Sequence, residues 1–192
     1  MRISPQTVDA SPPPAVVKEG NDWCRLISTS YAYHRAFIAG EIGEPKQYVE
    51  LIHLLRSARP EAEIEVYVNS HGGQMDSALQ IINAIRTCKA PVTTVLDGMA
   101  YSAGGLIFLS AGRHRVEPFA SLMCHLAFNL IGGKTTEVKA CADFREANFR
   151  RIASDLYSGF LTAKEMKLLL HGEDLWFDRD EIVRRLGKKV TA

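Results

Sequence analysis

The sequence predicts an α/β fold in which helices cover a mostly parallel sheet. Three observations support this fold class. Strand-like and helix-like segments alternate from residue 36 onward, the chain has 192 residues, and its hydrophobic and charged fractions are 46% and 23%, as in an ordinary globular protein. At roughly 150 residues per domain, this length fits a single domain. Strands that alternate with helices need crossover connections, and crossovers give parallel pairing.

Four short segments have the pattern of β-strands. In one of them Ile64, Val66 and Val68 alternate with other residues, which places all three on one face. Another is β-branched and follows Pro91, and the first is an apolar run that should end at Gly40. The predicted strands are residues 36–39, 63–68, 92–96 and 121–125.

Between these strands, apolar residues recur every three or four positions, which is the period of an amphipathic helix. The predicted helices are residues 48–58, 75–85, 103–110 and 135–160. The last one is long for a globular helix, and four large apolar side chains form a stripe along it. Such a stripe must be covered, either by the chain's own sheet or by a partner. Its members are Phe149, Ile152, Leu156 and Phe160.

Charge and hydropathy exclude two classes of protein. Lys and Arg number 23 and Asp and Glu 22, so the net charge is +1, and no basic excess is present to bind nucleic acid. The apolar run over residues 98–112 is shorter than the roughly 20 residues that a membrane-spanning helix needs. We therefore expect no nucleic-acid partner and no membrane.

The proline content of the first residues predicts where the domain begins, and the spacing of the cysteines indicates the cellular compartment. Residues 1–20 are rich in proline and poor in apolar residues, which predicts a flexible arm before a single domain over residues 21–192. No apolar signal segment precedes that domain. The four cysteines lie far apart without a C-x-x-C pair, so we expect no metal cluster, no disulfide framework and a cytoplasmic location.

Two predicted strand ends carry residues suited to chemistry, since active sites of such sheets lie beyond the carboxyl ends of the strands. One strand is followed by N-S-H-G-G (69–73), whose glycines leave backbone N–H groups uncovered, although a plain turn explains a G-G pair equally. The other is followed by G-M-A-Y-S-A-G-G (98–105), where Ser102 starts a helix as in a nucleophile elbow. The alternative is that Ser102 merely caps the helix.

A serine nucleophile needs a base, normally histidine, oriented by a carboxylate. Six histidines are available, and three of them lie in polar or charged stretches where a surface position is expected. Those three are His34, His53 and His114. His71 lies beside the paired glycines, His125 ends an apolar strand, and His171 lies near a helix end. The pattern alone does not choose among these three.

Four motifs in order resemble the proteolytic subunit of the Clp protease (ClpP). They are F-I-A-G (37–40), V-N-S-H-G-G (68–73), D-G-M-A-Y-S-A-G-G (97–105) and L-M-C-H (122–125). That family shows N-S-P-G-G, G-x-A-x-S-M-G and V-M-I-H-Q-P at similar separations. The resemblance covers about residues 36–186. It implies a ClpP/crotonase-like spiral of βαβ units with a protruding helical handle at about residues 135–160.

The same resemblance assigns roles to individual residues. Ser102 corresponds to the nucleophile, His125 to the general base and Asp174 to the acid of a triad. Gly73 and Ala103 correspond to the two backbone N–H donors of an oxyanion hole. The implied activity is that of a serine endopeptidase acting on unfolded proteins and peptides, without metal or cofactor.

The resemblance also implies an assembly. Family members form two stacked seven-membered rings around a chamber, and we expect the handle to meet the same helix of the opposing ring. An AAA+ Clp unfoldase is the implied partner, although the N-terminal signature of the family's axial loop is absent here. Other departures are His71 for proline, Tyr101 for a small residue, Ala103 for methionine, and Arg185-Leu186-Gly187 where the family has Y-G-L-[IV]-D.

Two other functions compete with a peptidase. A crotonase-type acyl-CoA enzyme shares the spiral fold and an oxyanion hole of two amides, but has no use for a serine–histidine pair. A catalytically impaired ClpP-like subunit would serve only the structure of a ring, and the presence of Ser102, His125 and Asp174 argues against it.

Overall fold

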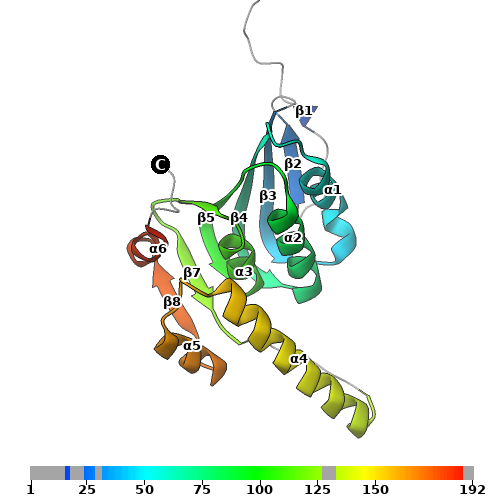
Figure 1. The fold of residues 1–192 in the computed structure, drawn as a ribbon, viewed down its shortest axis with the longest axis vertical. Helices are drawn as coiled ribbons and strands as arrows, with labels where there is room; N and C mark the ends of the chain where they lie inside the picture. The colour runs from blue at the N-terminus through cyan, green and yellow to red at the C-terminus, as the bar shows by residue number, and fades with distance from the viewer. Residues whose placement is uncertain (1–15, 18–23, 29–31, 127–132, 188–192) are drawn as a thin grey trace, which may run out of the picture.

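One mixed sheet of eight strands organises the part of the chain that the structure, a computed structural model, describes: residues 16–17, 24–28, 32–126 and 133–187 (Figure 1). The strands are β1 (Val16–Val17), β2 (Cys24–Ser28), β3 (Tyr33–Ile42), β4 (Glu63–Gly73), β5 (Val92–Tyr101), β6 (Arg113–Val116), β7 (Ser121–Cys124) and β8 (Leu175–Asp178). The helices are a 3-10 turn η1 (Pro45–Tyr48), α1 (Val49–Ser57), α2 (Met75–Thr87), α3 (Ala103–Leu109), α4 (Thr135–Leu156), α5 (Ala163–Leu170) and α6 (Arg179–Leu186).

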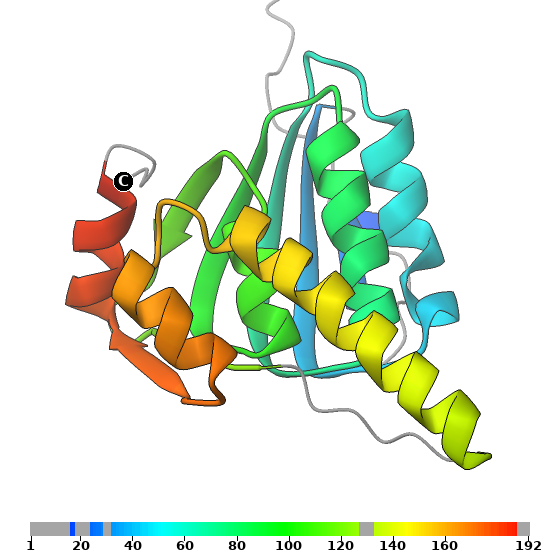
Figure 2. The same cartoon turned by 60° about the horizontal axis from the view of Figure 1, so that its bottom comes forward.

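The sheet is parallel at its centre and antiparallel at both sides. Its order is β1-β2-β3-β4-β5-β7-β8, with β6 beside β5. The pairs β3–β4, β4–β5, β5–β6 and β5–β7 are parallel, whereas β1–β2, β2–β3 and β7–β8 are antiparallel. Helices α1, α2 and α3 cover one face, and α4 projects away from the body (Figures 1 and 2). The predicted α/β spiral with a protruding helix is confirmed.

The core lies between the sheet and the helices on its covered face. Ile64, Val66 and Val68 alternate along β4 and are fully buried, as their spacing predicts. They belong to one cluster with the inner faces of α1 and α2 and with the whole of α3. Burial of each large apolar side chain contributes roughly 1.5–3 kcal/mol, so this layer fixes the strands that carry the site.

The three central strands are longer than predicted. Strand β3 does not end at Gly40, because that glycine adopts φ 77° and absorbs a register shift, after which Ile42 pairs with Gly73. Strand β4 continues through the N-S-H-G-G segment to Gly73, and β5 continues to Tyr101. The two motifs singled out in the sequence are therefore the ends of adjacent strands.

Strands β1, β2, β6 and β8 were not predicted, and β6 overturns one expectation about histidine. His114 is buried rather than on the surface, because alternation along the four-residue strand turns it inward. Its Nδ1 lies 2.9 Å from the Thr94 hydroxyl, which donates to the Phe108 carbonyl. The hydroxyl therefore accepts from Nδ1–H. His34 is half-buried in β3, and only His53 is exposed as expected.

The long helix is shorter than predicted, and its stripe has a different partner. Helix α4 ends at Leu156, and Gly159, at φ 80°, turns the chain before Phe160. Phe149, Leu156 and Phe160 are buried in the chain's own core, so the expectation that this stripe meets an opposing ring is wrong. The amino-terminal half of α4 is mostly exposed, with Phe144 at 70%.

Two further expectations concern the ends of the chain and membranes. The arm predicted over residues 1–20 lies outside the described residues, apart from Val16–Val17, which pairs with β2. Among the helices that the structure describes, none combines the length and the apolar character needed to cross a bilayer.

Candidate active site

Ser102 lies at a sharp bend between β5 and α3. Its φ of 56° and ψ of −122° make it the one non-glycine residue of the described chain with positive φ. Backbone in such a region costs about 1–3 kcal/mol and persists where its surroundings hold it. Here the Ser102 N–H donates to the Met123 carbonyl at 3.0 Å. The hydroxyl makes no capping bond to α3, so the interpretation of Ser102 as a simple helix cap is wrong.

His125 follows β7 and reaches Ser102 directly. Strand β7 runs parallel to β5, with Tyr101 opposite Met123, so the two strand ends lie side by side. His125 Nε2 is 2.6 Å from Ser102 Oγ. When the hydroxyl donates this bond, Nε2 is unprotonated, and a neutral imidazole then carries its proton on Nδ1.

Asp174 comes to the same place from the carboxy-terminal part of the chain. Strand β8 pairs antiparallel with β7, with Leu175 opposite Cys124, and Asp174 directly precedes β8. Its Oδ1 lies 3.8 Å from His125 Nδ1, which is ion-pair distance and longer than a hydrogen bond. The side chains of His125 and Asp174 are 24% and 53% exposed, so the imidazole is the more enclosed of the two.

Of the two glycines at the end of β4, Gly72 lies against the serine and Gly73 lies against the backbone of Ile42 in β3. A Cβ atom on Gly72 would come within 2.8 Å of both Ser102 Cβ and the Tyr101 carbonyl oxygen. Gly72 and Gly73 also adopt φ of 102° and 147°, a region that disfavours side chains. Of the two residues assigned to an oxyanion hole by resemblance, Ala103 follows Ser102 and has its nitrogen 3.2 Å from such a Cβ atom on Gly72, whereas Gly73 is the residue after Gly72.

Methionine and aromatic side chains border the site on the outer sheet face. Met123 pairs laterally with Tyr101 on one side and with Trp176 on the other. The rings of Tyr101 and Trp176 meet edge to face at 5.1 Å, and the Tyr101 hydroxyl shares a 2.8 Å bond with Ser121. Because side chains alternate along a strand, this row lies on the same face as His125 and Asp174. Tyr101, a departure from the family pattern, thus belongs to a row with Met123 and Trp176 on this face.

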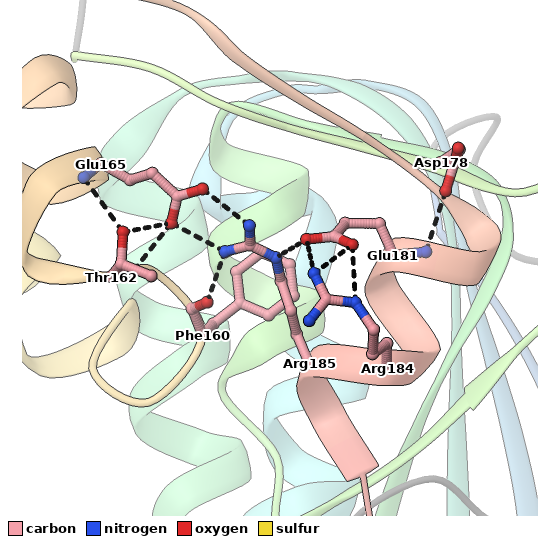
Figure 3. A network of polar contacts seen from close by, with 7 residues as sticks. All are labelled: Phe160, Thr162, Glu165, Asp178, Glu181, Arg184 and Arg185. Atoms are coloured by element: carbon pink, nitrogen blue, oxygen red, sulfur yellow. Dashed lines mark hydrogen bonds and ion pairs between the residues drawn. The ribbon is translucent and has the colours of Figure 1, made fainter.

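A polar network holds the segment that carries Asp174 (Figure 3). The Arg185 guanidinium from α6 donates to both carboxylate oxygens of Glu165 in α5, at 2.7 and 2.8 Å. It also donates to the Phe160 carbonyl and stacks on the Phe177 ring at 4.6 Å. Hydrogen bonds from Arg185 lower the pKa of Glu165 to about 2.

This network was missed from the sequence, where Arg185 was only a departure from the family pattern. One sequence signal could have located Glu165, the partner of Arg185. Thr162 and Glu165 have the spacing of a capping box, and both hydrogen bonds of that motif are present in the structure. Asp178 caps α6, where its Oδ1 accepts from the Glu181 N–H at 2.9 Å. The network ties both helices that flank Asp174 to each other.

Neither of the other two candidate histidines is hydrogen-bonded to Ser102 in the described part of the chain. His71 is exposed near the end of β4, and His171 caps the end of α5, where Nδ1 donates to the Lys167 carbonyl. In the ranges that the structure describes, no cluster of three or more His, Cys, Asp or Glu side chains could hold a metal ion. Of the three histidines left open by pattern alone, the structure thus brings His125 to Ser102.

A bent serine, a histidine bonded to it and an acid behind that histidine have the relative positions found in serine hydrolases. The family model for Clp protease matches residues 18–168, well over half of the chain. The chain therefore belongs to the Clp protease family, as its motifs predicted.

Individual relatives agree with this assignment. The ATP-dependent Clp protease proteolytic subunit of Deinococcus radiodurans is 30% identical over 136 residues, which cover 70% of this chain and 66% of that protein. Subunit 2 of Borreliella burgdorferi is 35% identical over 130 residues, covering 64% and 66%. The chloroplastic subunit 3 of Arabidopsis thaliana is 31% identical over 113 residues, covering 58% and 36%. The chain thus spans about two thirds or less of these relatives, and the family match ends before Asp174.

Proposed function

We propose that this chain is a ClpP-type serine endopeptidase that hydrolyses peptide bonds in unfolded polypeptides. The observation that carries the proposal is the 2.6 Å contact between Ser102 Oγ and His125 Nε2 at a positive-φ bend. A serine held in that way has its hydroxyl bonded to a base. A crotonase-type enzyme would not require this contact.

In the proposed reaction, Ser102 Oγ attacks the peptide carbonyl while His125 takes the hydroxyl proton. Asp174 faces Nδ1, where it fixes the imidazole tautomer and stabilises the imidazolium. His125 then donates the proton to the leaving amine. Water next attacks the acyl-enzyme while His125 takes a proton from it, and His125 returns that proton to Ser102 Oγ as the carboxylic acid product leaves. The backbone N–H groups of Gly73 and Ala103 receive the oxyanion, and the loss of one such donor typically lowers turnover by ~10²–10³.

The assembly is a second part of the proposal. We propose a homo-oligomer of two stacked seven-membered rings that encloses the site. The surface that supports this is the mostly exposed amino-terminal half of α4, where the half-buried Val138 and Cys141 and the exposed Phe144 recur at helical spacing. The relatives are named ATP-dependent, so we further propose that an AAA+ Clp unfoldase delivers substrates, in the cytoplasm.

Labelling with a fluorophosphonate tests the chemistry directly. This reagent reacts with activated serines, so we expect one adduct on Ser102, located by mass spectrometry after digestion, and none in Ser102→Ala. Hydrolysis of unfolded casein and of short fluorogenic peptides is measured on the same samples. An unlabelled and inactive wild-type chain, at a size consistent with full assembly, would contradict the proposal and favour a purely structural subunit.

A further inference from the structure

Ser70 is a buried polar residue that the proposed mechanism does not use. It lies in β4 and has no exposed surface. Its hydroxyl donates to the Gly40 carbonyl oxygen at 2.5 Å and accepts from the Gly72 N–H at 3.0 Å. A single side chain therefore connects β3 to Gly72, the glycine that lies against Ser102.

The position of Ser70 coincides with two irregularities of the sheet. The β3–β4 register shifts between Ala39 and Glu41, and the β4–β5 register shifts between Val68 and Ser70. Regular ladder bonds are interrupted at such shifts, and backbone groups there need other partners. The Ser70 hydroxyl supplies one for Gly40 and one for Gly72.

Ser70 also lies directly under the first turn of α3. A Cβ atom on Gly104 would be 3.0 Å from the Ser70 carbonyl oxygen and 3.4 Å from Ser70 Cβ. Gly72, bonded to Ser70, is in turn the residue whose Cβ would meet Ser102 and the Tyr101 carbonyl. Ser70 thus contacts both Gly72 and the first turn of α3, the two segments between which the oxyanion is proposed to lie.

We infer that Ser70 is a positioning residue that fixes the peptide of Gly72 and, through it, the N–H direction of Gly73. This inference rests on the proposed function. Glycine has no Cβ to restrict its rotation, so Gly72 and Gly73 keep their positive φ only where hydrogen bonds hold them. Because a hydrogen bond weakens steeply when it is misaligned, a rotated Gly73 N–H stabilises the oxyanion much less.

The chain offers a matched control at Ser77. This residue, in α2, is also fully buried, and its hydroxyl donates to the Gly43 carbonyl at 2.6 Å, just beyond β3. It differs from Ser70 in that neither Gly72 nor Gly73 is bonded to its side chain. Loss of either hydroxyl should reduce stability by a similar amount, whereas only the loss of Ser70 should affect the transition state.

The test compares Ser70→Ala, Ser70→Cys and Ser77→Ala in the full-length chain. We measure kcat and KM for a peptide substrate, the affinity for a peptide boronate, and the melting temperature. For Ser70→Ala we expect kcat to fall roughly 10- to 100-fold, with KM nearly unchanged and boronate affinity reduced by a similar factor. Ser70→Cys, with a weak donor and acceptor of similar size, should be intermediate, and Ser77→Ala should retain wild-type kcat.

The outcomes separate this inference from the proposed function. Wild-type kcat in a folded Ser70→Ala, or an equal loss of kcat in Ser77→Ala, overturns the positioning role alone. If Ser70→Ala does not fold, Ser70→Cys decides: unchanged kcat and boronate affinity overturn the role. A wild-type chain that neither hydrolyses peptides nor reacts with the fluorophosphonate overturns the proposed function and this inference together.

Discussion

At the scale of single residues, the site depends on a bond between two strand ends. Ser102 projects from a strained bend that the Met123 carbonyl holds, and His125 lies two residues beyond Met123. The backbone that fixes the serine is therefore the same strand that delivers the histidine. The pairing of β5 with β7 thereby brings the two side chains to their 2.6 Å contact.

The first prediction concerns the nucleophile. Ser102→Ala should abolish peptide hydrolysis, because it removes only the attacking oxygen. The melting temperature and circular dichroism should stay close to those of the wild type, since the hydroxyl makes no bond that supports α3. Turnover at the wild-type rate in the purified variant would rule out Ser102 as the nucleophile.

The second prediction concerns the acid. Asp174→Asn should lower kcat by orders of magnitude, with ~10⁴ as the precedent in another triad enzyme, because an amide no longer selects the Nδ1–H tautomer. Glu173→Gln is the matched control, since Glu173 is an exposed neighbouring carboxylate. If Glu173→Gln is inactive and Asp174→Asn is not, the acid has been assigned to the wrong residue.

The histidines show what residue patterns can and cannot predict. Ser102 was identified from small residues at a strand end, which is local information. Pattern alone left His71, His125 and His171 open, and the resemblance to a family assigned His125. The pairing of β5 with β7, which no local pattern encodes, explains why His125 is the histidine that reaches Ser102. His114 was misplaced because its arginine neighbours suggested a surface, whereas alternation in a short strand separates the three side chains.

At the scale of elements, α5, β8 and α6 behave as one unit held by Arg185. The guanidinium side chain is 13% exposed and bonds Glu165, Glu181 and the Phe160 carbonyl. It lies over the Phe177 ring of β8, the strand that follows Asp174. The position of the acid therefore depends on an ion-pair network that the sequence pattern did not reveal.

The third prediction tests this network. Arg185→Gln should destabilise the fold by roughly 2–3 kcal/mol, because it leaves the Glu165 carboxylate with fewer charged partners. Arg184→Gln, on the same helix, is the control, since Arg184 is exposed and bonds only Glu181 among the described contacts. Urea unfolding measures both. Equal losses in the two variants would contradict a special role for Arg185.

The fourth prediction is a dependence of stability on pH. The pKa of Glu165 is about 2 in the folded chain and 4.5 as its ordinary value, so the ionised form favours folding. That contribution is complete above about pH 4.5 and is lost as pH falls toward 2. The stability difference between wild type and Glu165→Gln should therefore shrink over this range. A difference that stays constant from pH 6 to pH 3 would contradict it.

The full lengths of the strands could not be predicted from residue patterns. The centres of β4 and β5 were predicted because apolar residues alternate or are β-branched there. Their polar, glycine-rich ends were not, because the pairing of Ile42 with Gly73 and of Ser70 with Ala100 depends on neighbouring strands. The end of α4 was misjudged for a related reason, since Phe160 continues the apolar spacing although Gly159 has already turned the chain.

At the scale of the whole molecule, the two halves of α4 differ in their surroundings. Its carboxy-terminal half packs into the core, whereas the other half extends away from the body (Figure 2). Phe144 is 70% exposed on this projecting half, and a contact with another copy of the chain is its proposed cover. This replaces the buried stripe as the expected contact between rings.

The fifth prediction distinguishes the roles of the two halves of α4. Phe144→Asp should shift the assembly toward single rings or smaller species in sizing chromatography, while the melting temperature of the subunit changes little. Leu156→Asp should instead unfold the subunit, because it places a charge in the core. A Phe144→Asp variant that elutes like the wild type would show that this half of α4 makes no contact essential for assembly.

The antiparallel attachment of β8 divides the site into two parts. Ser102 and His125 directly follow adjacent parallel strands within the region of the family match, whereas Asp174 lies beyond it, in the unit that Arg185 holds together. A substitution in that unit can therefore displace Asp174 while the contact between Ser102 and His125 stays in place. Damage to the unit is expected to impair the site in steps rather than all at once.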